Sequence, residues 1–217
     1  MCNFTSVDME TWHRADLYHH YTEVWQTCLM TFNIRLDVTN TVKYVRNMGM
    51  KLAPALYYLA ARTLCEQSNF RMGYDEGRLG FWDELCPLYP VMNMYKDITF
   101  HSAKWSDNYR EYYYNYVEEK RQNVGCVKAV CEALPKNYVL MSILPFMDFE
   151  SCSFSLKNPK GYLSPTIFFG KYEIKDGTVT MPLSFTFNHA VADGYHAQKF
   201  FEDFQKKLAV PENYLEV

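Results

Sequence analysis

The residues best suited to chemistry stand together in one short segment, 187–194, which reads FNHAVADG. An alternating apolar stretch with the period of a β-strand precedes the histidine, and an Asp-Gly pair follows it. Loops at strand ends often carry reactive side chains, and a histidine there accepts a proton near neutral pH because its unperturbed pKa is about 6.5. We therefore take His189 as a candidate general base, a role that typically contributes about 10²–10⁴ in rate.

These residues also have plain structural interpretations. A single histidine near a strand end is more often structural than catalytic, and Asp193 alone suits a helix cap or a turn. His189, Asp193 and His196 have the i, i+4, i+7 spacing that could bind a metal ion if all three were helical. Gly194 and the turn interrupt that helical face, so we expect no metal site.

The composition indicates an ordinary globular protein. The 217 residues are enough for one sizeable core and few for two, so we expect a single domain over 1–217. Apolar residues make up 48 % of the chain and charged residues 22 %, while the aromatic share of 17 % is high. An aromatic excess suits a plain core, a deep pocket or a subunit interface. The seven cysteines include no Cys-x-x-Cys pair, which argues against a zinc ribbon or a thioredoxin motif.

The charge pattern argues against several kinds of partner. The net charge is −3 and no basic stretch stands out, so nucleic acid and anionic membrane are poor partners. No apolar run reaches the roughly 18–20 residues that span a bilayer. The first residues lack the basic and apolar regions of a signal peptide. We therefore expect a cytoplasmic protein without a membrane partner.

Hydrophobic periodicity divides the chain into strands and helices. The predicted strands are 30–36, 70–74, 79–82, 88–95, 98–102, 139–144, 166–174 and 179–187, and the predicted helices are 12–21 (capped by Asp8), 41–48 (capped by Thr39 or Asn40), 52–65, 108–121 and 194–208. Hairpins mixed with helices, without regular βαβ units, predict an α+β fold with a mixed or antiparallel sheet packed with helices. Pro182 inside the last strand predicts a sheet edge or a bulge.

The pattern His-x-x-x-Asp-Gly after a Phe-rich strand resembles the active-site signature of chloramphenicol acetyltransferases and of the related dihydrolipoyl acyltransferase cores. The pattern alone is weak, but other matches to the family occur in the right order along nearly the whole chain. They are Trp12-His13-Arg14 with Tyr21, Phe70-Arg71-Met72, Met141-Ser142-Ile143-Leu144-Pro145-Phe146 with Phe149, and Pro182-Leu183-Ser184. The resemblance implies the family's acyltransferase fold.

The resemblance also implies a reaction and a set of roles. His189 would take a proton from a substrate hydroxyl, which attacks the thioester of acetyl-CoA directly. Ser142 would hydrogen-bond the tetrahedral oxyanion. Arg14 and Asp193 would form a buried ion pair that holds the loop, so Asp193 would have no part in orienting His189. Acetyl-CoA would be a co-substrate, with no permanently bound cofactor.

The family forms trimers with active sites at the subunit interfaces, so the resemblance implies a homotrimer. Tyr21 and Phe146 fall at positions where the family contacts the acceptor. Lys171 and Tyr172 fall at positions where it contacts coenzyme A.

Some positions depart from the family pattern and leave the acceptor open. Asn188 stands where a second histidine is common, Phe146 where tryptophan is usual, and Leu140 where a polar residue is expected. Three alternatives follow: an acyltransferase of the same fold with another hydroxylated acceptor, a dihydrolipoyl acyltransferase core, or a non-catalytic protein that sequesters a ligand. A serine hydrolase ranks last because Ser142 lacks the Gly-x-Ser-x-Gly elbow.

Overall fold

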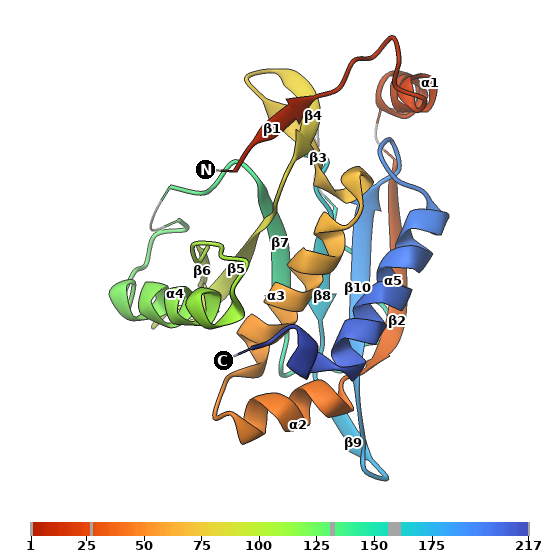
Figure 1. The fold of residues 1–217 in the computed structure, drawn as a ribbon. Helices are drawn as coiled ribbons and strands as arrows, with labels where there is room; N and C mark the ends of the chain where they lie inside the picture. Colours follow the sequence, from red (N-terminus) through yellow and green to blue (C-terminus); the bar gives the residue numbers. More distant parts are fainter. Residues whose placement is uncertain (1, 27, 131–132, 156–161, 217) are drawn as a thin grey trace.

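The computed structural model describes residues 2–26, 28–130, 133–155 and 162–216 (Figure 1). The α-helices are α1 (Ala15–His19), α2 (Thr39–Asn47), α3 (Leu52–Cys65), α4 (Tyr109–Gln122) and α5 (Gly194–Ala209). A π-helical turn, η1 (His20–Val24), and two 3₁₀ turns, η2 (Ser68–Arg71) and η3 (Pro211–Asn213), complete them. The strands are β1 (Phe4–Ser6), β2 (Leu29–Asp37), β3 (Met72–Asp75), β4 (Arg78–Trp82), β5 (Cys86–Met92), β6 (Ile98–His101), β7 (Tyr138–Ile143), β8 (Thr166–Phe169), β9 (Glu173–Lys175) and β10 (Thr178–Asn188).

The large sheet has the strand order β2-β10-β8-β7-β5-β6, with β9 paired to β10. The β5–β7 and β7–β8 pairs are parallel, and the other pairs of this sheet are antiparallel. A small antiparallel sheet has the order β1-β4-β3. The expected α+β fold with a mixed sheet is therefore confirmed.

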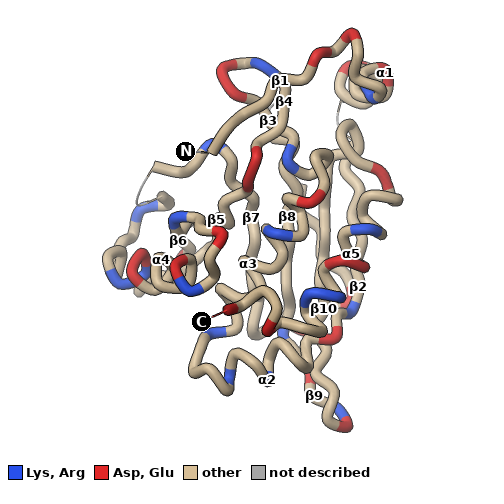
Figure 2. The backbone as a smooth tube through the Cα atoms, in the orientation of Figure 1, with Lys and Arg blue, Asp and Glu red and all other residues tan. Residues whose placement is uncertain are grey.

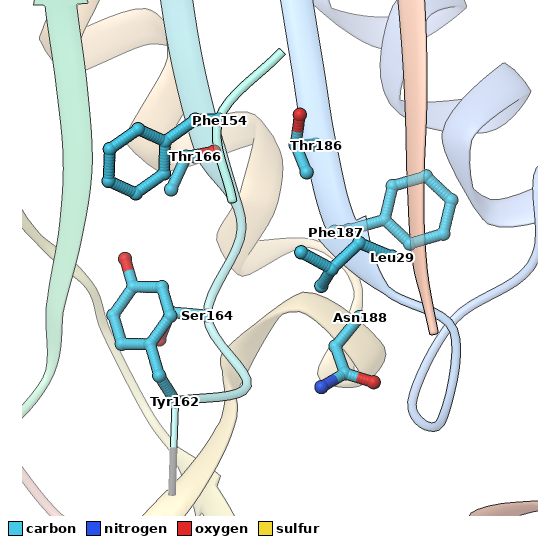
Figure 3. Close-up of a pocket in the computed structure, with 8 residues that line it drawn as sticks. All are labelled: Leu29, Phe154, Tyr162, Ser164, Thr166, Thr186, Phe187 and Asn188. Atoms are coloured by element: carbon cyan, nitrogen blue, oxygen red, sulfur yellow. The ribbon is translucent and has the colours of Figure 1, made fainter. Parts of the chain in front are cut away.

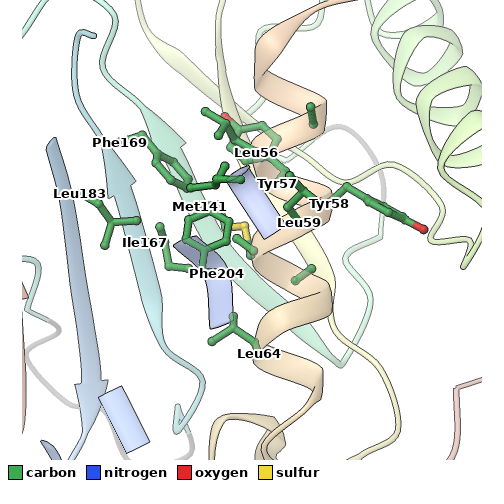
Figure 4. Close-up of a cluster of buried hydrophobic side chains, with 14 of the residues drawn as sticks. Leu56, Tyr57, Tyr58, Leu59, Leu64, Met141, Ile167, Phe169, Leu183 and Phe204 are labelled. Carbon is green, nitrogen blue, oxygen red and sulfur yellow. The ribbon is translucent and has the colours of Figure 1, made fainter. Parts of the chain in front are cut away.

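Helices cover one face of the large sheet (Figure 1). Along β10, Leu183, Phe185 and Phe187 are buried against this helical layer, where Phe185 stacks on Phe200 of α5. The core continues through α3 and the inward residues of β7 and β8 (Figure 4). Because strand side chains alternate between faces, the residues between these on β10 point to the opposite side of the sheet.

The prediction that Pro182 marks an edge was wrong, because β10 lies between β2 and β8. Pro182 lies at the break where β8 has ended and β9 has not begun, and its carbonyl accepts a hydrogen bond from Gly170 N–H (2.9 Å). The backbone groups of a strand residue point to the same side, so its missing N–H faces this break. A proline thus fits an interior strand without removing a ladder hydrogen bond.

Two helix starts also differ from the predictions. Asp8 accepts hydrogen bonds from Glu10 N–H and the Thr11 hydroxyl, which closes a separate turn, and α1 begins only at Ala15. At α2, Asp37 accepts from Thr39 N–H (2.9 Å), so the helix begins before the predicted residue 41.

The central strands β7, β8 and β10 carry no charged residue, whereas charges gather on the helices and the loops (Figure 2). On the neighbouring strand β2, Arg35 pairs with Pro182 of β10 and contacts Asp148 after β7. In the part of the chain that is described, no helix is long and apolar enough to cross a membrane. A single domain over 1–217 stays a prediction.

Candidate active site

The side chain of Arg14 holds the loop that follows β10. Its Nε donates to the carbonyl of Ala190 (2.9 Å), and a terminal nitrogen donates to the carbonyl of His189 (2.8 Å). The two terminal nitrogens also contact both carboxylate oxygens of Asp193, at 2.6 and 2.8 Å. Arg14 is 4 % exposed whereas the side chain of Asp193 is 39 % exposed, so the pair is buried on the arginine side and open to water on the carboxylate side. Five guanidinium donors in a planar fork suit this combination of one carboxylate and two carbonyls.

The imidazole of His189 is held in one tautomer. Its Nδ1 lies 2.9 Å from the carbonyl oxygen of Ala192 and 3.2 Å from Oδ1 of Asp193. A carbonyl oxygen can only accept, so Nδ1 carries the proton and Nε2 of the neutral ring is free to take one. Asp193 contacts the ring because, as the residue before α5, it turns its carboxylate back over the loop. The hydrogen bond of the ring nevertheless goes to the Ala192 carbonyl, and the expectation that Asp193 has no part in orienting His189 stays a prediction.

Tyr21 lies directly on the imidazole. The two rings stack with centroids 4.4 Å apart and planes 24° from parallel. Tyr21 belongs to η1, which continues α1 from Arg14, so the residue that holds the loop and the residue that stacks on the base come from one segment. The stacked ring restricts rotation of His189 about its side-chain bonds.

Ser142 lies on β7 at 3 % exposure, on the sheet face away from the helices, since its neighbour Met141 is in the core. Ser142 pairs with Phe168 of β8, and Phe168 pairs with Ser184 of β10. His189 lies five residues beyond Ser184, which is about 17 Å along a strand, and two strand spacings of about 4.8 Å separate β10 from β7. The structure thus does not bring Ser142 and His189 of one chain within reach of the same small group.

A pocket of about 420 Å³ begins at the end of β7. Ile143, which follows Ser142, lines it together with Lys171 and Tyr172. The hydroxyl of Tyr172 accepts a hydrogen bond from Arg46 of α2 (3.1 Å). The pocket therefore has a largely apolar interior and two cationic side chains near Tyr172.

Phe146 lies in the loop after β7 and is 65 % exposed. Its ring is therefore available for contact with a ligand or another chain. The structure thus brings Arg14, Asp193, Tyr21 and His189 together at one end of β10, and places Ser142, Phe146, Lys171 and Tyr172 around the end of β7.

The sequence pointed to His196 only as a possible metal ligand, and its place in the structure is different. Asp193 N–H donates to Nδ1 of His196 (3.0 Å), while the Asp193 carboxylate accepts from the backbone N–H of His196. This is a capping box with histidine in the position usually held by Glu or Gln. The sequence feature that could have predicted this capping box is the Asp-x-x-His spacing at the start of a helix. No group of three or more metal-ligating side chains is present in the described residues.

The fold matches those of known acyltransferases. A solved chloramphenicol acetyltransferase superimposes with a TM-score of 0.79 at 19 % identity, covering 95 % of this chain and 100 % of that one. A dihydrolipoamide acetyltransferase of Azotobacter vinelandii gives a TM-score of 0.65 at 16 % identity, covering 93 % and 88 %. The fold is therefore that of the acyltransferase class.

The sequence comparisons show the family within this class. The family model of chloramphenicol acetyltransferase matches residues 2–205. A chloramphenicol acetyltransferase of Clostridium perfringens is 30 % identical over 98 % of both chains, and one of Staphylococcus aureus is 32 % identical over 93 % of this chain and 97 % of its own. The chain belongs to the chloramphenicol acetyltransferase family and is an acyltransferase.

Replacing Arg14 with lysine should lower the free energy of unfolding by about 2–3 kcal/mol at pH 7, because one ammonium cannot serve two carbonyls and a carboxylate. Arg35→Lys is the matched control: that guanidinium pairs with Asp148 at the surface and should cost about 0–1 kcal/mol. Urea denaturation measures both. Equal losses in the two variants would contradict the clamping role of Arg14.

The same pair sets a pH dependence. Hydrogen bonds from the Arg14 guanidinium hold the pKa of the Asp193 carboxyl below its ordinary value. The stability that this ionisation contributes is therefore present above the ordinary carboxyl pKa of about 4 and is lost as the pH falls through the lowered value. The difference in the free energy of unfolding between wild type and Arg14→Lys, measured by urea denaturation, should become smaller below about pH 4.

The capping box should weaken in mild acid. Burial lowers the pKa of His196. The Asp193 carboxylate raises this pKa, but Arg14 and His13 lower it, so the net shift is downward. Protonation thus favours the unfolded chain, and stability should fall as the pH drops below the unfolded value of about 6.5. Gln in place of His196 retains an acceptor that does not titrate, whereas His196→Ala should lose about 1 kcal/mol relative to wild type at pH 7 and less in mild acid.

Urea denaturation at pH 7 and at pH 5.5 tests this assignment. His196→Gln should lose less stability than wild type between the two pH values. If it loses as much, another group is responsible for the dependence.

Proposed function

We propose that this protein transfers the acetyl group of acetyl-CoA to a hydroxyl of chloramphenicol. The observation that carries the proposal is the state of His189: Nδ1 donates to the Ala192 carbonyl, so Nε2 is available as a base. The names of the curated relatives supply the acceptor. An acceptor bearing another hydroxyl is the alternative, favoured by the departures at Leu140, Phe146 and Asn188.

In the proposed reaction Nε2 of His189 takes the proton of the acceptor hydroxyl as its oxygen attacks the thioester carbonyl. The carbonyl becomes a tetrahedral oxyanion, to which the hydroxyl of Ser142 donates a hydrogen bond. The intermediate collapses, the carbon–sulfur bond breaks, and the thiolate of coenzyme A takes the proton back from the imidazolium. A thioester is already activated, so one base and one oxyanion donor are sufficient, and such a donor typically contributes about 10²–10³ in rate.

The proposed enzyme is a homotrimer in which two chains complete each site. The separation of Ser142 from His189 within one chain supports this, because both must contact a single intermediate. The base, Tyr21 and the Arg14–Asp193 pair would then come from one subunit, and Ser142 and Phe146 from its neighbour. The exposure of Phe146 fits a surface that a neighbour covers. A closed ring of three copies uses the same contact three times.

Acetyl-CoA is the proposed co-substrate, with its arm in the pocket beside Ile143 and its charged groups toward Lys171. The pocket of about 420 Å³ is lined by Ile143, the residue after Ser142 in β7, and by Lys171 and Tyr172. Acetyl-CoA is made inside cells, so we place the protein in the cytoplasm. In the Azotobacter dihydrolipoamide acetyltransferase, a serine and a histidine have been investigated for their role in the catalytic mechanism, in line with the two roles proposed here.

Purified protein should release free thiol from acetyl-CoA rapidly when chloramphenicol is added, and His189→Ala should lose this activity with its melting temperature unchanged. Thiol release is followed with a colorimetric reagent, with and without chloramphenicol. A His189→Ala protein that keeps most of its rate would contradict the base assignment. A wild-type protein without chloramphenicol-dependent release would move the acceptor to another hydroxylated molecule.

Hybrid trimers test the shared site. His189→Ala and Ser142→Ala should each be nearly inactive, but in a trimer a Ser142→Ala chain supplies an intact histidine and a His189→Ala chain an intact serine. Random assembly of equal amounts leaves about one site in four intact, so about a quarter of wild-type activity should return after co-refolding. Separately refolded and then mixed proteins are the control. No recovery in the co-refolded sample would place both residues in one chain.

A further inference from the structure

A row of side chains crosses the face of the large sheet that lies away from the helices. Thr31 of β2 pairs with Thr186 of β10, Thr186 pairs with Thr166 of β8, and Thr166 pairs with Leu140 of β7. Directly paired residues point to the same face. The row therefore sets three threonines and a leucine side by side, with Ser142 two residues beyond Leu140 on the same face.

The three threonine hydroxyls differ in their partners. Those of Thr31 and Thr186 bond each other at 2.8 Å. The hydroxyl of Thr166 is buried and has no hydrogen-bond partner among the residues that the structure describes, and the residue is only 3 % exposed. Leaving a buried hydroxyl unpaired is unfavourable, and valine would fit the same space without a polar atom. Thr166 therefore contributes a polar group that the fold itself does not use.

Thr166 is one of the residues that line a small pocket (Figure 3). Thr166 lines it together with the rings of Phe154 and Tyr162, and with Asn188, the residue before His189. The ring of Phe154 packs on Phe168, the partner of Ser142. The pocket has a volume of about 20 Å³, which is enough for one group of the size of a water molecule. An oxygen carried at the end of a larger ligand fits this space.

Thr166 also stands next to the position where the family pattern has lost a polar residue. Leu140 occupies that position, and its direct partner on the neighbouring strand is Thr166. The hydrogen-bonding group thus lies one strand away from its expected place, on the same face and close to the same serine. Such a shift changes which atom of an acceptor is recognised while leaving the serine in place.

We propose that Thr166 binds the acceptor through its hydroxyl, and that the acceptor carries a second hydrogen-bonding oxygen beside an apolar or aromatic body. This inference rests on the proposed acetyl transfer and adds the substrate class to it. The apolar body lies against Phe154 and Tyr162, and the oxygen pairs with Thr166 Oγ1. Molecules with a single hydroxyl and no second oxygen are therefore poor acceptors.

The test uses three variants of the full-length protein. Thr166→Val removes the hydroxyl and keeps the shape, and Thr166→Ser keeps the hydroxyl. Thr41→Val is the matched control, because the buried hydroxyl of Thr41 donates to the Leu208 carbonyl (2.8 Å) near the end of α5. Steady-state kinetics with chloramphenicol and acetyl-CoA give the two KM values, and thermal melting gives the stability.

Thr166→Val should lower kcat/KM for chloramphenicol about five- to tenfold, mainly through KM, and leave the KM for acetyl-CoA unchanged. It should melt at or above the wild-type temperature, whereas Thr41→Val should melt below it. Thr166→Ser should stay close to wild type in kcat/KM for chloramphenicol and in melting temperature. An unchanged KM for chloramphenicol in Thr166→Val would overturn the inference.

Failure of the proposed function has a different signature. If the wild-type protein does not acetylate chloramphenicol, the acceptor in the proposed function is wrong, and melting then decides the role of Thr166. A Thr166→Val protein as destabilised as Thr41→Val shows a hydroxyl that serves the fold, which overturns the inference. A melting temperature at or above that of wild type supports a hydroxyl kept for a ligand.

Discussion

The contact on which the rest of the site depends is the guanidinium of Arg14 against the loop after β10. One side chain satisfies two backbone carbonyls and a carboxylate that belong to a segment about 175 residues away in sequence. Without it, the turn between β10 and α5 would leave those carbonyls without partners in a place where water is scarce. The direction of His189 follows from this contact, because the loop that Arg14 holds also supplies the Ala192 carbonyl.

Because side chains alternate along β10, the strand has one face that packs in the core and one face that is polar. One set of residues is apolar and packs on α5, which fixes the strand in the core. The other set, with Ser184, Thr186 and Asn188, is polar and faces away from the helices. The same rule places Met141 in the core and Ser142 on the far face. A shift of one residue in the pairing of β7 with β8 would exchange these two and bury the serine in the core.

Hydrophobic periodicity and short motifs were sufficient to predict many of the helices and strands. The strand β2, the helices α3 and α5 and the β3–β4 hairpin lie close to their predicted ranges, because their apolar patterns are long and regular. Pro182 misled the prediction, because its tolerance depends on a break in the neighbouring strand that lies elsewhere in the sequence. The contact of Asp193 with His189 was missed for a similar reason, since it depends on how the helix start folds back.

The distance between Ser142 and His189 could not be read from the sequence at all. It depends on the register of three strands, and a spacing of 47 residues in the chain says nothing about register. The same pairings reveal that Thr166 is the neighbour of Leu140. Residues that depart from a family pattern are therefore best interpreted together with their cross-strand partners, because a polar group lost from one strand can be supplied by the next.

The division of the site between two places has a physical advantage. His189, Tyr21 and Arg14 form a unit whose contacts are complete within one chain, and Ser142 is fixed by the backbone of an interior strand. In the proposed trimer, assembly is then the docking of two rigid surfaces, and the base and the oxyanion donor approach each other without a further loss of chain entropy. In the proposed trimer the subunit contact would set the precision of the site, so subunit association and catalysis are expected to be lost together.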